Sequence, residues 1–193
     1  MTTFKDIITI HQPKPRYKIL KEMSTRWSPR YYADKKIPLR HIKIIFEAAR
    51  FSPSGHNYQP WHFYYAKKGT HSYEKLFSTL NEYNQSWAVT APLLILACAI
   101  PRNKEAENTF AFYDLGASVL SLVLQTQSLG YYARQMGLFD KNEVKRVFKL
   151  DKDLEPFIII ALGKIGDYRN ASKEIVEMEL DPRPRKTDIF TEL

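Results

Sequence analysis

The stretch Phe51–Phe63, FSPSGHNYQPWHF, joins an amphipathic helical pattern to an aromatic strand pattern. Connections between such elements are usually about four to six residues long and polar. This one is longer, is bent by Pro53 and Gly55, and has aromatic residues on both sides. The side chains that could donate and accept hydrogen bonds toward a heterocycle are Ser52, Ser54, Asn57 and Gln59. Taken alone, a turn that satisfies its own backbone is the simpler interpretation, so the rest of the chain must decide the role of the loop.

Before the loop, residues 38–50 carry the pattern of a helix that faces a core. Its apolar residues recur at i, i+3, i+4 and i+7, at Ile42, Ile45, Phe46 and Ala49. Pro38 suits the first turn of this helix, and Pro53 ends it. Residues 17–25 predict a shorter helix, which stops before Pro29 because the residue preceding a proline avoids helical angles.

After the loop, three apolar runs predict strands. Residues 61–67 are rich in aromatic side chains, whereas residues 92–100 and 156–164 are apolar throughout, as strands covered on both faces are. Residues 70–87 carry a helical pattern. Residues 108–130 predict the longest helix, which is apolar nearly all round and is therefore expected to be buried. These elements predict an α+β class, with long helices around a small sheet.

Two local signals mark the end of one helix at residue 130 and the start of another at residue 140. Gly130 suits the left-handed position that follows a helix C-terminus. Asp140 followed by Glu143 resembles a capping box, which predicts a further helix.

The composition is that of an ordinary globular domain, with 193 residues, 44% of them hydrophobic and 26% charged. We expect a single domain over residues 1–193. No apolar run approaches the roughly 20 residues of a membrane span, and the N-terminus lacks a signal-peptide pattern. The lone Cys98 lies inside an apolar run, which predicts a buried structural thiol and a cytoplasmic protein. The net charge of +8 favours an anionic partner but leaves open nucleic acid, a phosphorylated cofactor or solubility alone.

Several kinds of chemistry have no signature in this sequence. It contains no CxxC or HxxxH spacing for zinc, no GxSxG elbow, and neither a GxGxxG nor a Walker loop. Its carboxylates are scattered over predicted helices, where solvated faces explain them. A nucleotide, if one binds, is therefore not held by a Rossmann fingerprint.

Two short basic segments are candidates for binding phosphate. Arg26-Trp27-Ser28-Pro29-Arg30 is extended by its proline, and the strand period of two puts Arg26, Ser28 and Arg30 on one side. Two guanidiniums beside a hydroxyl suit a phosphate group, although a solvated turn is the simpler interpretation of the segment alone. The second segment holds Arg183, Arg185 and Lys186, which alone is an ordinary basic tail.

Together these features occur in the order found in one known family. FSPSGHNYQPWHF closely resembles the SPSxxNxQPW signature of the nitroreductase family of flavin mononucleotide (FMN) enzymes. RWSPR resembles the family's R-x-S-x-R segment, and NQSW (84–87) followed by Ala91-Pro92 resembles its N-x-x-W…AP stretch. DLGASVLSLVLQTQSLGY, RQMGLFD and PRPRK are similar to the long central helix, the loop beside the flavin and the C-terminal basic element. The resemblance runs from about residue 20 to the end of the sequence.

Three positions depart from the family pattern. Ser118 and Ser121 stand where many relatives carry Gln and Asn, and Arg134 stands where relatives often have His. These departures concern the substrate pocket more than the fold.

The resemblance implies a nitroreductase-like α+β sandwich, in which helices surround a small, mainly antiparallel sheet. It also implies a homodimer, with a tail from about residue 180 to residue 193 extending over the partner subunit. FMN would lie at the dimer interface, and NADH or NADPH would be the reductant. No side chain is expected to be catalytic and no metal is expected, because the flavin carries the hydride chemistry.

The resemblance assigns roles to individual residues. The residues that would hold the FMN phosphate are Arg26, Ser28, Arg30, Arg185 and Lys186, and Trp27 is a further expected cofactor-binding residue. The loop residues that would line the isoalloxazine ring from the partner subunit are Pro53, Ser54 and Asn57. Asn84 would address the pyrimidine edge, and the residues that would cover the ring near its reactive nitrogen are Met136, Gly137 and Leu138.

The implied activity is transfer of a hydride from NAD(P)H through the flavin to a small-molecule acceptor, such as a nitroaromatic or a quinone, by a ping-pong mechanism. Neither nucleic acid nor a membrane is an expected partner. Two alternatives stay open. A flavin-binding regulatory or storage protein would bind FMN without oxidising NAD(P)H, and a nucleic-acid-binding module would bind DNA or RNA with a steep salt dependence.

Overall fold

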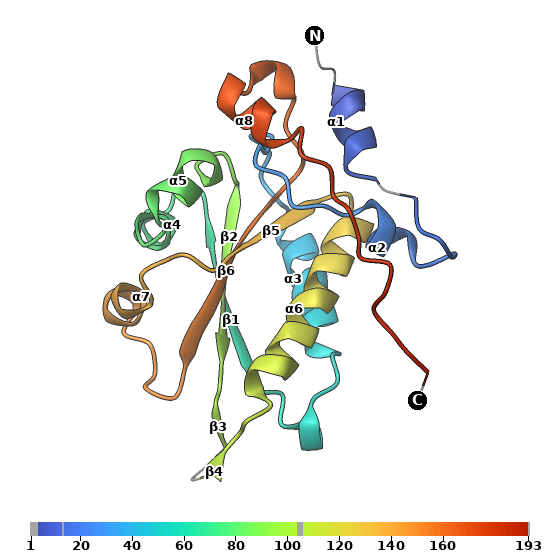
Figure 1. Cartoon of the computed structure of the whole chain (residues 1–193). Helices are drawn as coiled ribbons and strands as arrows, with labels where there is room; N and C mark the ends of the chain where they lie inside the picture. Colours follow the sequence, from blue (N-terminus) through green and yellow to red (C-terminus); the bar gives the residue numbers. More distant parts are fainter. Residues whose placement is uncertain (1–3, 13, 104–105, 193) are drawn as a thin grey trace.

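A four-stranded sheet in the order β1-β2-β6-β5 forms the centre of the molecule, between two layers of helices (Figure 1). The computed structural model describes residues 4–12, 14–103 and 106–192. The strands are β1 (Trp61–Lys67), β2 (Leu93–Ala99), β5 (Tyr132–Met136) and β6 (Glu155–Gly163). Every neighbouring pair in this sheet is antiparallel. The expected α+β class with a small antiparallel sheet is therefore confirmed.

The central strand β2 is buried along its whole length, as its uniformly apolar sequence predicts. Alternate residues face the two helical layers: Leu94 and Leu96 pack into one hydrophobic cluster, whereas Leu93 and Ile95 pack into the other. The predicted burial of Cys98 is confirmed, and that burial raises the pKa of its thiol to about 12. Among the described residues, no helix has both the length and the apolar character needed to cross a bilayer.

One layer consists of α3 (Leu39–Arg50) and α6 (Ala111–Ser128). Three residues of the stripe predicted on α3, Ile42, Ile45 and Ala49, are buried against the sheet. Within one chain α6 is buried on one side only, because Tyr113 is 79% exposed and Leu120 is 46% exposed. The sheet and α3 cover only one side of α6, and the apolar residues of the opposite side face outward.

The other layer consists of α4 (His71–Ser78), α5 (Glu82–Ala88) and α7 (Lys141–Phe148). Residues 70–87 were expected to form one helical segment, but the structure divides them into α4 and α5. Asn81 causes the division, because its side chain accepts a hydrogen bond from the backbone N–H of Asn84 and so begins α5 as an N-cap. The capping signal of α7 is confirmed, since Asp140 Oδ1 accepts a hydrogen bond from Glu143 N at 2.9 Å.

The segment expected as a loop, RQMGLFD, instead begins as strand β5. Gly130 has φ +74°, the left-handed conformation predicted for it at the end of α6, and so redirects the chain into the sheet. Only the residues from Gly137 onward leave the strand.

The remaining elements are short and complete the two ends of the molecule. They are α1 (Phe4–Ile10), α2 (Lys21–Thr25), η1 (Gly55–Asn57), the hairpin β3 (Arg102–Asn103) and β4 (Ala106–Glu107), η2 (Tyr168–Asn170) and α8 (Lys173–Met178). The helix expected over residues 17–25 is confirmed only as α2, its last five residues. Beyond α8, residues 181–192 form neither helix nor strand and run past α2 and α6 (Figure 1).

Candidate functional site

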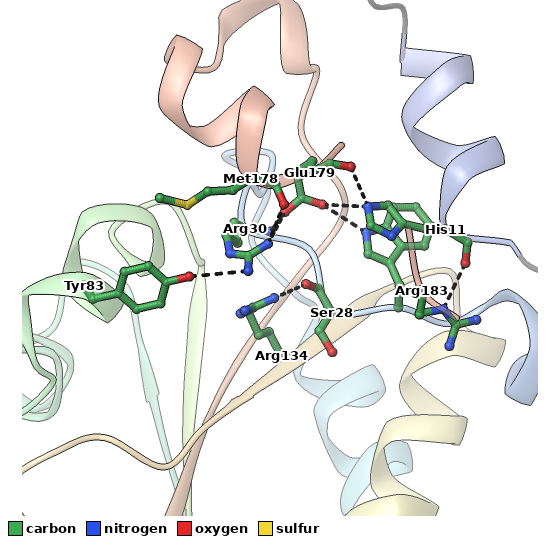
Figure 2. A network of polar contacts seen from close by, with 9 residues as sticks. His11, Ser28, Arg30, Tyr83, Arg134, Met178, Glu179 and Arg183 are labelled. Atoms are coloured by element: carbon green, nitrogen blue, oxygen red, sulfur yellow. Dashed lines mark hydrogen bonds and ion pairs between the residues drawn. The ribbon is translucent and has the colours of Figure 1, made fainter. Parts of the chain in front are cut away.

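The two basic segments of the sequence meet around one cavity of about 400 Å³, which we call the arginine chamber. The guanidinium-bearing residues that line it are Arg26, Arg30, Arg134, Arg183 and Arg185. Trp27, Ser28, Gln135 and Asp181 are also among the lining residues. Figure 2 shows part of this cluster. The sequence predicted that Arg26, Ser28 and Arg30 share one side, and all three do reach the chamber.

A buried carboxylate holds one wall of the chamber in place. Glu179, which follows α8, is fully buried, and its side chain accepts hydrogen bonds from the backbone N–H of Arg30 at 2.9 Å and from Trp27 Nε1 at 3.3 Å. The guanidinium of Arg30 forms an ion pair with Glu179 at 3.4 Å, and His11 Nε2 lies 3.4 Å from the same carboxylate (Figure 2). Burial alone would raise the pKa of Glu179, but the hydrogen bond from His11 and the charge of Arg30 hold it below its usual value. The carboxylate therefore stays ionised and fixes the position of Arg30.

The other cations of the chamber have fewer partners. Arg183 ties the tail to the N-terminal segments, because it donates to the carbonyl of His11 at 3.1 Å and to that of Ser24 at 2.9 Å. Arg185 donates only to the carbonyls of Arg183 and Pro184 among the described residues. Its guanidinium therefore has donors left for a ligand.

Burial and the closeness of the positive charges lower the pKa values of two arginines of the chamber. Burial lowers the pKa of Arg183 to about 10, and the charges of Arg185 and Arg26 add to that shift. Burial and the charge of Arg185 also lower the pKa of Arg26. The buried Nε atoms of Arg26 and Arg30 lack a hydrogen-bond acceptor within the described part of the chain. An anion in the chamber would satisfy these groups, so the donor set fits a phosphate.

A second group of predicted residues meets where β5 ends. Asn84 on α5 is buried, and its Nδ2 donates to the carbonyl of Leu138 at 3.2 Å. Met136 is buried at the end of β5, whereas Gly137 and Leu138 are exposed. The fold thus brings together Asn84 and the segment 136–138, as predicted, but the Asn84 amide is already used to hold that segment.

The third group lies in the loop 52–59 after α3. Pro53 and Asn57 are exposed and Ser54 is half-buried. His56, Asn57 and Gln59 all have φ between 50° and 56°, a conformation that residues other than glycine rarely adopt. The loop therefore holds a constrained shape.

Helix α6 anchors this loop. Asp114, which is 3% exposed, accepts a hydrogen bond from the backbone N–H of Gly55 at 3.1 Å. Ser52 donates to Ser121 at 2.8 Å, and Ser118 donates to the last carbonyl but one of α3, that of Ala49. The two serines that depart from the family pattern thus fasten the loop and the end of α3.

The loop and the chamber lie at opposite ends of α6 in one chain (Figure 1). Asp114 contacts the loop, whereas Gln127, thirteen positions later, donates to Thr25 beside the chamber at 3.4 Å. At 1.5 Å per residue this is a separation of about 20 Å. One chain alone therefore does not bring the predicted ring-lining loop and the predicted phosphate site together.

Sequence reasoning missed some residues of the chamber. Glu179, His11 and Asp181 were not singled out, because an isolated carboxylate or histidine has no spacing that marks it. Arg134 was noted only as a departure from the family pattern. Of the predicted residues, Trp27 is buried with its indole N–H on Glu179, and Lys186 lines an adjoining cavity that shares Arg183 and Arg185 with the chamber.

Comparison with known families and structures decides where this arrangement belongs. The model of the nitroreductase family matches residues 23–79 and 67–164, well over half of the chain. The chain belongs to the nitroreductase family. Its membership confirms the family resemblance, the nitroreductase-like fold and the class of enzyme that the motifs predicted.

Individual members of the family match over most of the chain. A solved structure described as an oxidoreductase containing FMN is 27% identical, with a TM-score of 0.86 over 100% of this chain and 97% of that one. A nitroreductase family protein from Streptococcus pneumoniae TIGR4 is 18% identical and shares the fold, with a TM-score of 0.72 over 91% of this chain and 100% of its own. A Methanothermobacter thermautotrophicus protein with the provisional name NADH dehydrogenase/NAD(P)H nitroreductase is 28% identical over 153 residues, 75% of this chain and 76% of its own. These names agree with the expected cofactors.

Proposed function

We propose that this member of the nitroreductase family is an FMN-dependent oxidoreductase that passes a hydride from NADH or NADPH to a small-molecule acceptor. The observation that carries the proposal is the arginine chamber, where both basic segments of the family pattern converge on one cavity. Its unpartnered guanidinium donors suit the phosphate of FMN. The nitroaromatics and quinones reduced by many flavoenzymes are the proposed acceptors.

The residues of this chain would divide the work of holding FMN. Arg26, Ser28, Arg30 and Arg185 would bind the phosphate, with Trp27 and Lys186 beside them. The segment 136–138, fastened by Asn84, would cover the ring. The bound flavin would supply the hydride chemistry, which explains why no acid/base pair is needed among the side chains.

A second copy of the chain would complete the site. The loop 52–59, with Pro53, Ser54 and Asn57, lies too far from the chamber of its own subunit and would line the ring bound by the partner. The outward face of α6 supports a homodimer, because its exposed apolar residues include Tyr113 and Leu120. Ile189 and Phe190 of the tail are about four-fifths exposed and would also be covered by a partner.

Spectroscopy of the purified protein tests the cofactor. A yellow protein whose heat-released flavin elutes as FMN supports the proposal, and FAD or no flavin after reconstitution contradicts it. Bleaching by NADH or NADPH without oxygen separates an enzyme from a flavin-binding protein that lacks turnover.

Steady-state kinetics test the mechanism. With one site used in turn by the nicotinamide and the acceptor, double-reciprocal plots with a model quinone should give parallel lines. Intersecting lines would contradict the ping-pong mechanism. Ending the chain after Leu180 should remove the tail cations and the apolar end of the tail, and should give a flavin-free protein that is monomeric or aggregates.

A further inference from the structure

Arg134 is the guanidinium of the arginine chamber that belongs to neither basic segment of the sequence. It lies on β5, and its Nη1 donates to the carbonyl of Ser28 at 2.5 Å (Figure 2). Its guanidinium also stacks over the ring of Trp87, 5.0 Å from the centroid, and Trp87 is fully buried. The side chain is thus held from two sides in the wall of the chamber.

The positive charge of Arg134 is not neutralised by a contact in the protein. Within the described ranges no carboxylate forms an ion pair with it, and the carbonyl of Ser28 is its hydrogen-bond acceptor. Burial lowers the pKa of Arg134 and the neighbouring charge of Arg30 lowers it further, whereas the charge of Glu179 acts in the opposite direction. An arginine nevertheless stays protonated in proteins, so Arg134 adds a second positive charge beside Arg30, with which the carboxylate of Glu179 already pairs.

Holding the backbone of Ser28 would not by itself require this residue. A neutral donor such as glutamine could serve a carbonyl group without placing a second guanidinium beside Arg30. The cost of that second charge is offset if it contributes to binding an anion, because charge-assisted hydrogen bonds are stronger than neutral ones.

We propose that Arg134 is a binding residue for the phosphate end of the flavin and that it contributes to the preference of this protein for FMN over riboflavin. This inference rests on the proposed function. Arg26, Ser28, Arg30 and Arg185 form the recognised phosphate segments, and Arg134 adds to them a charge from the sheet that the family signature does not include.

Titrating the flavin-free protein with FMN and with riboflavin, by quenching of flavin fluorescence, tests the proposal. Arg134→Gln removes the charge while keeping a side-chain donor for Ser28. We expect the affinity for FMN to fall at least about tenfold and the affinity for riboflavin to change less than about twofold, because one charge-assisted contact is lost. Arg134→Lys keeps the charge and should retain part of the preference. Arg146→Gln, which removes an exposed arginine paired with Glu143, is the control and should change neither affinity.

Equal losses of FMN and riboflavin affinity would overturn the proposal, since they would mean that Arg134 only shapes the site. Unchanged FMN affinity would overturn it as well. If the unaltered protein binds neither flavin, the proposed function fails, and inorganic phosphate then decides the role of Arg134 by itself. A rise in melting temperature with phosphate that is lost in Arg134→Gln supports an anion-binding role, and an equal rise in both proteins contradicts it.

Discussion

The two ends of α6 carry candidate binding surfaces of different kinds. At its C-terminal end, the arginine chamber gathers side chains from four places in the sequence and depends on charge, with Glu179 buried among its cations. At its N-terminal end, the loop 52–59 is one continuous segment whose shape is set by backbone conformation and by a hydrogen bond to Asp114. We propose that the chamber binds the anionic end of a ligand and that the loop lines a flat ring. The difference predicts that variants at the two ends will affect flavin binding in different ways.

The largest effect should come from breaking the proposed dimer, which would separate the chamber of one subunit from the loop 52–59 of the other. Leu120→Glu places a charge on the exposed apolar face of α6, so the dimer and the bound flavin should be lost together. Light scattering and flavin absorbance measure the two losses. Val89→Glu, at a similarly exposed apolar residue that follows α5, is the matched control and should keep both. A 22.6 kDa monomer of the intact protein that still binds FMN would contradict the composite site.

The next effect should come from replacing Arg30 in the chamber, which should lower the free energy of unfolding. Arg30→Ala leaves the fully buried Glu179 without its guanidinium partner, and breaking such a buried pair costs about 3–5 kcal/mol. Urea unfolding of the flavin-free protein measures the free energy of unfolding. Arg146→Ala, which breaks an exposed pair, should cost less than about 1 kcal/mol. If the two variants unfold alike, Glu179 does not depend on Arg30.

The phosphate contacts themselves should have a smaller effect, confined to binding. Arg26→Ala and Arg185→Ala each remove a charge-assisted contact of about 1.5–3 kcal/mol, so FMN affinity should fall about ten- to a hundredfold. The fold should be retained, since neither guanidinium forms an ion pair among the described residues. Fluorescence titration measures the change, and riboflavin affinity should stay nearly constant. Unchanged FMN affinity in both variants would place the phosphate elsewhere.

The buried carboxylate of Glu179 should make the stability of the fold depend on pH. Since its contacts in the folded protein lower the pKa of Glu179 below its usual value of 4.5, the ionised carboxylate stabilises the fold at higher pH. That contribution should be complete above about pH 4.5 and should be lost as the pH falls through the lower folded value. The difference in melting temperature between the unaltered protein and Glu179→Gln should therefore shrink from pH 6 to pH 3. A difference that stays constant would mean that ionisation of Glu179 adds nothing.

The smallest effect should come from the loop end. Asp114→Asn can still accept a hydrogen bond from Gly55 but loses its charge, a change of about 1 kcal/mol. FMN and riboflavin affinities should fall together, by about fivefold, because the loop would contact the ring common to both. A loss confined to FMN would mean that the two ends of α6 do not act separately.

The elements whose local patterns agreed with their surroundings could be predicted from the sequence. The stripe on α3, the apolar strands β2 and β6 and the cap at Asp140 are settled by residues close together in the chain. The division of residues 70–87 and the strand β5 could not be predicted in the same way. Their boundaries depend on contacts with distant segments, such as the pairing of β5 with β6.

The same distinction applies to the candidate site. The sequence by itself determined the family, the loop 52–59 and the two basic segments, because each is a continuous run with characteristic spacing. Only the tertiary structure placed Arg134 and Glu179 with those segments and put the loop at the other end of α6. A charge acts through distance in space rather than through position in the chain, so single residues on distant elements carry no local pattern that would reveal their association.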